Sequence, residues 1–203
     1  FSHLKYFKRH PIIPADLLMK YREGLILGSA CEAGELFSAV VEGKPWNELK
    51  EIASFFDYLE IQPIGNNRFM LESGAARDEE QLREFNRTVL KLGDALQKPV
   101  VATGDVHFLE PEDAQYRAIL MAGMGFSDAD KQAPLYFKTT NEMLEEFSYL
   151  GRERAREVVV ENPNKIADWC EDIKPVPDDK CPPVIPGSAE EIETMAKQKA
   201  AEL

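Results

Sequence analysis

The chain has 203 residues, 44% of them hydrophobic, and a formal net charge of −12. This length allows one domain with a hydrophobic core plus an extension, and no apolar run approaches the ~20 residues that a membrane-spanning helix requires. The acidic balance argues against a protein that binds nucleic acid over its whole surface, because phosphate binding needs a basic surface. Residues 1–22 differ, since their basic side chains outnumber the acidic ones. We interpret them as a solvated segment or as a patch that contacts nucleic acid or another domain.

The cysteines and the first residues indicate the setting of the chain. Cys31, Cys170 and Cys181 are odd in number and widely spaced, so neither a disulfide framework nor a zinc ribbon is predicted. A reduced, cytoplasmic location fits best. The chain starts at Phe1 without an initiator methionine or a signal-peptide pattern. We therefore expect a fragment of a longer polypeptide.

Residues 14–108 alternate between predicted helices and predicted strands. The clearest helix spans 79–97, because apolar residues recur there at steps of three and four behind a capping pattern at Asp78. Such alternation predicts a parallel β/α architecture. A complete eight-unit barrel needs ~250 residues, so an α/β fold with part of a barrel, or a small sheet, is expected. The other elements expected here are helices over 14–23 and from 45, strands over 25–28, 58–63 and 100–103, a turn over 29–35 that opens a helix, and a loop with a short helix over 66–77.

Residues after 108 are predicted to be mostly helical. A helix should begin at Pro111, and another should follow the capping box that Thr139 forms with Glu142. Further helical pieces are expected over 152–161 and 164–170. Five prolines within 173–187 predict an extended linker, and they are Pro175, Pro177, Pro182, Pro183 and Pro186. A polar, helix-prone tail follows this linker. The expected organisation is β/α units over 1–134, a helical connector over 135–172, and linker plus tail over 173–203.

Asp105 and His107 are the strongest candidates for chemistry. They follow the apolar run 99–103, and alternate residues of a strand share a face, so both side chains can point into one site. A carboxylate and an imidazole together suit a divalent metal such as zinc or manganese. The alternative is structural: Asp105 caps the helix at Pro111 and His107 hydrogen-bonds to the backbone.

Three further residues lie at the ends of predicted strands. Cys31 follows the predicted strand 25–28, and the carboxyl ends of parallel strands meet at one rim, so its thiolate is a candidate third ligand. Glu60 and Gln62 end the middle strand and are candidates near the site. The alternatives are a small buried cysteine and ordinary polar positions of a half-exposed strand. His3 and His10 are interpreted as surface residues.

Several catalytic motifs are absent from the sequence. It contains no glycine-rich phosphate loop, no G-x-S-x-G and no H-E-x-x-H. Nucleotidyl transfer by two metal ions needs clustered catalytic aspartates, and no such polymerase-type cluster is predicted in this chain. The chain by itself is therefore not expected to polymerise DNA.

Three segments together resemble the PHP (polymerase and histidinol phosphatase) domain, in its form in PolC-type DNA polymerase III alpha subunits. They are Glu23-Gly-Leu-Ile-Leu-Gly-Ser-Ala-Cys31-Glu-Ala-Gly-Glu35, Tyr58-Leu-Glu-Ile-Gln-Pro63 and Pro99-Val-Val-Ala-Thr-Gly-Asp-Val-His107-Phe. The segments 2–7 and 137–147 fit the same subunit. The resemblance covers nearly the whole chain and implies the later part of a distorted β/α barrel with a mostly helical C-terminal extension.

The resemblance also implies a metal site and a parent enzyme. Cys31, Asp105 and His107 match the last ligands of the family's rim site, which would hold zinc or manganese, whereas no ligand role is implied for Glu60 or Gln62. The family's opening H-x-H and remaining ligands have no match here, so weak metal binding is expected. The implied parent is a magnesium-dependent DNA-directed DNA polymerase with a proofreading exonuclease insert. The implied partners are the early PHP strands, that insert and the palm, with DNA contacted only through the parent.

Two alternatives stay open at this point. One is a free-standing PHP phosphoesterase that acts on a small phosphate, although the extension after Thr139 and the missing H-x-H disfavour it. The other is a pure interaction module without a metal, and it predicts that the three candidate ligands do not converge. A partial barrel would expose edge strands, so self-association is also expected.

Overall fold

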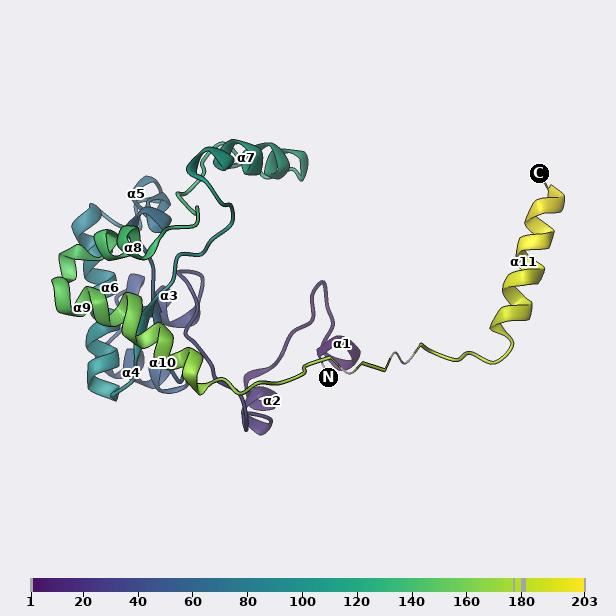
Figure 1. The fold of residues 1–203 in the computed structure, drawn as a ribbon, viewed down its shortest axis with the longest axis horizontal. Helices are drawn as coiled ribbons and strands as arrows, with labels where there is room; N and C mark the ends of the chain where they lie inside the picture. The colour runs from purple at the N-terminus through teal and green to yellow at the C-terminus, as the bar shows by residue number, and fades with distance from the viewer. Residues whose placement is uncertain (1, 177, 180–181, 203) are drawn as a thin grey trace. The chain divides into compact units, whose positions relative to one another are not determined.

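The fold was analysed in a computed structural model that describes residues 2–176, 178–179 and 182–202. It separates into two compact units, one that ends at Trp169 and one that starts at Cys170. Among the described residues, no helix is both long enough and apolar enough to cross a membrane. Figure 1 shows the elements in chain order, and most of them are helices.

A short parallel pair of strands forms the centre of the first unit. Strand β1 (Leu59–Ile61) pairs with β2 (Val100–Ala102), with Leu59 opposite Val100 and Ile61 opposite Ala102. All three residues of β2 are buried, as the apolar run predicts for a strand covered on both faces. The parallel pairing confirms the β/α alternation expected for this half of the chain.

Three helices supply most of the core around this sheet. They are α3 (Glu35–Val41), α4 (Trp46–Ser54) and α6 (Glu79–Leu96), which pack against one another. The predicted periodicity of α6 is confirmed, because Leu82, Phe85, Val89 and Leu92 are buried and the Asp78 side chain accepts a hydrogen bond from the Gln81 N–H. The same helix therefore provides the largest apolar face of the unit.

Lys98 joins the start of β2 to the end of α4. Its Nζ donates hydrogen bonds to the backbone carbonyls of Ala53 at 3.0 Å, Ser54 at 2.7 Å and Phe56. These carbonyls lie at and just beyond the C-terminal end of α4, which stops at Ser54, so the ammonium adds a donor there and complements the helix dipole. Burial lowers the pKa of Lys98 despite the nearby Asp57 carboxylate.

The expected strand over 25–28 is wrong. Gly28 makes one isolated parallel bridge to Tyr58, and Leu25 is 46% exposed. The reason is a side chain, because the Asp57 carboxylate accepts the Leu27 N–H at 2.7 Å and thereby takes a donor that a ladder would use. Arg22 holds Asp57 in place through an ion pair of 3.0 Å.

A partial barrel is therefore not shown. The described residues contain a two-stranded sheet within a mostly helical α/β unit. The first segment, which would have been a third strand, passes beside Tyr58 without continuous pairing. The coarser expectation of a mixed, parallel α/β fold holds.

Most of the remaining helices of the first unit begin near the positions that the sequence predicts, whereas α1 was not expected. Thr139 and Glu142 form the predicted capping box at the start of α8. Helix α7 follows a 3₁₀ turn at Pro111, as expected. These elements are α1 (Ser2–Lys5), α2 (Ala15–Lys20), η1 (Ile64–Asn67), α5 (Phe69–Ser73), η2 (Pro111–Asp113), α7 (Ala114–Gly123), α8 (Thr140–Glu146) and η3 (Ser148–Leu150).

The last two expected pieces of the first unit run together. Helix α9 (Arg152–Arg156) passes through the π-helical segment η4 (Glu157–Glu161) into α10 (Asn162–Trp169). Pro163 explains the π turn, because a proline in a helix has no N–H to donate and its ring displaces the preceding carbonyls. Asn162 is buried there and donates from Nδ2 to the Val100 carbonyl at 2.8 Å, which ties this helix to β2.

The second unit contains the proline-rich segment and the tail. The described residues between Cys170 and Ser188 form no helix or strand, and helix α11 (Ser188–Glu202) follows with none of its residues buried. Helix α11 lies within the segment that the sequence predicts to be helix-prone, and the role of 173–187 as a linker stays a prediction. Pro177 and Cys181 lie outside the described residues.

Candidate functional site

The loop after β2 carries the two leading candidates. Asn66 in η1 donates from Nδ2 to the Gly104 carbonyl at 3.2 Å, and the His107 N–H donates to the Leu135 carbonyl at 2.8 Å. Asp105 between these anchors has φ +52°, a left-handed conformation that is uncommon for a residue with a side chain. Such conformations persist where surrounding contacts hold them, and they concentrate at functional sites.

Asp105 and His107 lie side by side. Asp105 Oδ1 is 3.8 Å from His107 Nδ1, and the side chains of both residues are 41% exposed. His107 Nδ1 is also 2.7 Å from the backbone oxygen of Asp105. An Nδ1–H that donates to this carbonyl leaves the lone pair on Nε2, which is one arrangement in which a histidine can bind a metal.

Cys31 lies in a tight turn before α3. Ala30 has φ +61°, and the Gly34 N–H donates to the Cys31 carbonyl at 2.9 Å. A Cβ at Gly34 would come within 2.4 Å of the Ser29 carbonyl, so the turn requires glycine at this position. Cys31 is a free thiol, and its pKa is raised by burial first, with further contributions from Glu32 and Asp105.

The structure brings two of the three candidates together. Asp105 and His107 are adjacent, and Asp105 is near enough to Cys31 to act on its pKa. No group of three or more histidine, cysteine, aspartate or glutamate side chains within the described ranges is placed to hold a metal ion. The donor chemistry of the set, one sulfur, one oxygen and one nitrogen, is suitable for zinc, whereas its geometry here supplies only the carboxylate–imidazole pair.

Glu60 and Gln62 occupy different surroundings at the end of β1. Glu60 accepts a hydrogen bond from Thr103 Oγ1 at 3.2 Å, and its backbone N–H donates to Ser29 Oγ at 2.9 Å. It therefore connects the Cys31 turn with the end of β2. Gln62 is 5% exposed, and its Oε1 is buried without a hydrogen-bond partner.

Gly28 lies close to the side chains of Tyr58 and Glu60. A Cβ there would meet the Tyr58 ring at 2.4 Å and Glu60 Oε1 at 2.7 Å. A side chain at this position would force the ends of the Tyr58 and Glu60 side chains to move. Gly28 thereby determines how near the Cys31 turn comes to β1.

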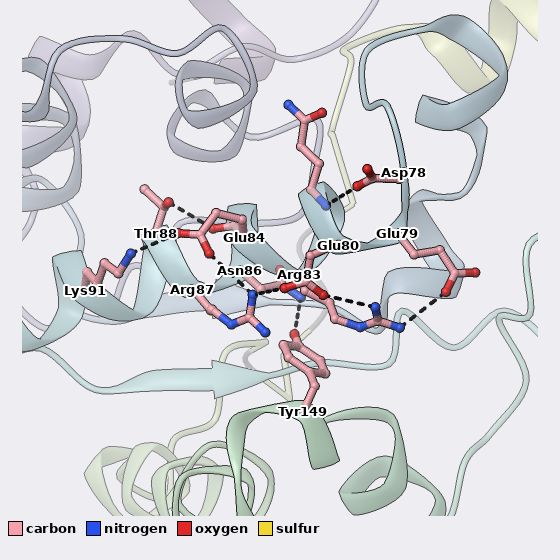
Figure 2. A network of polar contacts seen from close by, with 11 residues as sticks. Asp78, Glu79, Glu80, Arg83, Glu84, Asn86, Arg87, Thr88, Lys91 and Tyr149 are labelled. Atoms are coloured by element: carbon pink, nitrogen blue, oxygen red, sulfur yellow. Dashed lines mark hydrogen bonds and ion pairs between the residues drawn. The ribbon is translucent and has the colours of Figure 1, made fainter.

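Asn66 and Asn86 position the site and were not singled out from the sequence. Asn86 is 1% exposed and donates from Nδ2 to the Gln62 carbonyl and to the Tyr149 hydroxyl, both at 2.9 Å. Figure 2 shows this contact between α6 and the Tyr149 side chain. A signal existed for Asn86, because it lies four residues after Leu82 on the apolar face of α6. Asn66 had none, since it falls in a segment without periodicity.

Two arginines flank the Tyr149 ring. The guanidinium carbons of Arg83 and Arg87 lie 5.8 and 5.4 Å from the ring centroid. Both arginines also pair with Glu80 on the same helix (Figure 2). Burial raises the pKa of Tyr149, and the hydrogen bond from Asn86 and the two guanidinium charges partly oppose that rise. Tyr149 is thus held between a buried amide and a charged helix surface.

Comparison with known proteins finds curated sequences that are similar to this chain over nearly its whole length. No protein-family model matches it. Three similar curated proteins are each named DNA polymerase III PolC-type: one from Clostridium perfringens, 59% identical over 198 residues, one from Caldanaerobacter subterraneus, 57% over 202 residues, and one from Bacillus subtilis, 48% over 202 residues. The matches cover 98–100% of this chain and 14% of each relative. These identities confirm the polymerase resemblance: over nearly its whole length the chain is similar to one segment of proteins named DNA polymerase III PolC-type, and it spans 14% of their length.

Proposed function

We propose that this chain is one segment of the alpha subunit of a PolC-type replicative polymerase, whose whole polypeptide catalyses DNA-directed DNA synthesis with magnesium at a site elsewhere. The observation that carries the proposal is the 59% identity over 98% of the chain to a protein of that name. The partners of the segment are the rest of the subunit, and DNA is contacted through those other parts. A cytoplasmic location follows from that role.

We further propose that the segment supplies part of a PHP-type metal site and a scaffold. Asp105, His107 and Cys31 would hold a zinc or manganese ion, which supplies Lewis-acid chemistry when bound. Three features support this: the adjacent carboxylate and imidazole, the Nδ1 contact that orients the ring, and the left-handed backbone at Ala30 and Asp105. Glu60 would hold the Cys31 turn and the loop after β2 in position, through its contacts with Ser29 and Thr103.

The polymerase proposal is tested with primer extension. The full-length polymerase that contains this segment should extend a primed template with magnesium and deoxynucleotides. The 203-residue chain alone should extend none. A full-length protein that cannot extend the primer contradicts the proposal. Hydrolysis of p-nitrophenyl phosphate by the 203-residue chain with manganese would favour a free-standing phosphoesterase instead.

The metal proposal is tested by elemental analysis of the full-length protein. Asp105→Asn combined with His107→Gln should lower bound zinc or manganese, because both proposed ligands are removed and loss of even a ligand's hydrogen-bonding partner typically costs about 10- to 100-fold in affinity. The matched control is Asp16→Asn with His10→Gln, which changes the same residue types at exposed positions. Equal metal content in both variants and the unaltered protein contradicts the site. Primer extension that persists in the site variant is compatible with a separate polymerase centre.

A further inference from the structure

Lys138 carries a charge at a buried position. Its side chain is 2% exposed, and lysine is seldom buried unless partners replace the water around its ammonium group. The proposed metal site gives this charge no role. The contacts of the ammonium group therefore indicate what the lysine contributes to this part of the fold.

The Lys138 ammonium contacts a carbonyl, an aromatic ring and a carboxylate. Its Nζ donates a hydrogen bond to the Pro134 carbonyl at 2.6 Å, lies 4.2 Å from the centroid of the Tyr136 ring, and is 3.9 Å from Glu146 Oε1. Burial lowers the pKa of Lys138, whereas Glu146 and Glu142 favour the charged form and oppose that change. An apolar side chain of similar length could fill the same space, but it could not donate to Pro134.

The carbonyl that Lys138 binds directly precedes segment 135–137, which pairs with the end of the loop after β2. The Leu135 carbonyl accepts the His107 N–H at 2.8 Å and the Phe108 N–H at 3.4 Å. The same segment donates an N–H back to the Phe108 carbonyl at 3.0 Å. Because these hydrogen bonds join the two stretches, the position of segment 135–137 determines where the backbone of His107 lies.

The η1 turn contacts both Pro134 and the start of the same loop. A Cβ at Gly65 would come within 2.9 Å of Pro134 Cγ, so the proline ring packs directly against η1. Asn66, the next residue of η1, donates to the Gly104 carbonyl at 3.2 Å. Pro134 is therefore held by η1 and by the Lys138 ammonium, while η1 also holds the start of the loop.

We propose that Lys138 is a positioning residue for the candidate metal site, because its ammonium group fixes the segment that provides the backbone partner of His107. The inference rests on the proposed function, since the site that Lys138 positions is the pair of Asp105 and His107. Lys138 acts through the backbone of Pro134 and Leu135. Without the ammonium, this backbone can shift and His107 moves relative to Asp105. A metal held by both would then bind less tightly, since ligand atoms must lie within about 0.2 Å of their ideal distances.

The first test observes His107 directly in the 203-residue chain without metal. Lys138→Met keeps a side chain of similar length and removes the charge, and it should move the NMR signal of the His107 Cε1–H at constant pH. The chain has three histidines, so His107→Gln assigns the signal, and the signals of His3 and His10 should stay in place. Lys138→Arg retains a charged donor and should restore most of the original signal position. Methyl signals from the α6 core should be unchanged in each variant.

The second test measures zinc affinity of the full-length polymerase by competition with a chelator. Lys138→Met should lower the affinity about tenfold, the lower end of what loss of a ligand's support typically costs. Lys131→Met is the matched control, because Lys131 lies in the same part of the chain with a side chain that is 63% exposed. This control should change neither the zinc affinity nor the His107 signal.

Four results would overturn the inference. The first is a His107 signal that Lys138→Met leaves in place, and the second is an equal change in the Lys131→Met variant. The third is a signal that Lys138→Arg fails to restore, because the charge is then not what acts. The fourth is a loss of the α6 core signals in Lys138→Met, because the whole unit then depends on this lysine.

The zinc measurement separates this inference from the proposed function. If Asp105→Asn with His107→Gln lowers zinc binding and Lys138→Met does not, the metal proposal stands and the positioning role is overturned. If the double variant binds as much zinc as the unaltered protein, the metal proposal fails. The His107 signal then decides by itself whether Lys138 positions the loop.

Discussion

Asn86 offers the sharpest test of how the candidate site is held. Its side chain joins three elements, because it extends from α6 to the Gln62 carbonyl after β1 and to the Tyr149 hydroxyl after α8. Asn86→Ala removes both hydrogen bonds from a position that is 1% exposed. The end of β1 would lose a support, and with it the alignment of the loops that carry the candidate ligands.

The expected loss of stability follows from the contacts. Two hydrogen bonds contribute about 1 kcal/mol each, and the buried Gln62 carbonyl that loses this donor costs about 1–3 kcal/mol more. One term opposes these, because Asn86 Oδ1 is itself buried without a partner and its removal returns about 1 kcal/mol. The free energy of unfolding should therefore fall by about 2–4 kcal/mol. Tyr149→Phe removes one of the two hydrogen bonds and should cost about 1 kcal/mol.

Urea unfolding of the 203-residue chain, followed by circular dichroism at pH 7, measures these values. The double variant of Asn86→Ala and Tyr149→Phe should lose less than the sum of the single losses, by about 1 kcal/mol, since both remove the same hydrogen bond. Lys91→Ala on the exposed side of α6 is the control and should change stability by about 0.5 kcal/mol or less. A loss below about 0.5 kcal/mol for Asn86→Ala, or strict additivity, would refute the reasoning.

Three further perturbations test separate contacts. Burial places the folded-state pKa of Tyr149 above its unfolded value of about 10, so the free energy of unfolding falls as pH rises through the folded pKa. Tyr149→Phe should therefore flatten this alkaline decline, as measured by urea unfolding at a series of pH values. Lys98→Met should lower the free energy of unfolding by about 1–2 kcal/mol, because the carbonyls of Ala53, Ser54 and Phe56 lose the ammonium as a donor. Lys91→Met is its control, and equally small losses in both variants would contradict the assignment. Thr139→Ala should lower the free energy of unfolding by about 1 kcal/mol through loss of the capping box, whereas Thr140→Ala should change it little. A melting temperature that neither variant changes would show that the cap does not stabilise the protein.

Local rules predicted the helices well. The periodicity of α6, the caps at Asp78 and Thr139, and the proline at the start of η2 are short-range features, and each appears where expected. The buried parallel strands were also predictable, because β2 is continuously apolar. The error at 25–28 arose from Asp57, about 30 residues away, whose carboxylate takes the Leu27 N–H. No local pattern reports such a partner.

The candidate site shows the same division. Asp105 and His107 are two residues apart, so their adjacency follows from the sequence, and the structure places their side chains 3.8 Å apart. The position of Cys31 depends on Gly28, Glu60 and the left-handed turn at Ala30, and its inclusion in a metal site stays a proposal. Asn66 and Asn86 act through contacts 38 and 24 residues distant, which explains why pattern alone did not find them.

The sequence by itself determined the caps and periodicity of α6, the cap of α8, the two buried strands and the adjacent positions of Asp105 and His107, and it carries the polymerase resemblance. These features could be predicted because caps, periodicity and sequence motifs each depend on residues that are close together in the sequence. Only the tertiary structure decided that the first apolar segment does not join the sheet, that Asn86 supports the end of β1, and that Tyr116, Ile119 and Leu120 of α7 are exposed. Those outcomes depend on which side chains hydrogen-bond to a backbone group or cover a helix face, and tertiary packing between segments distant in the sequence determines this.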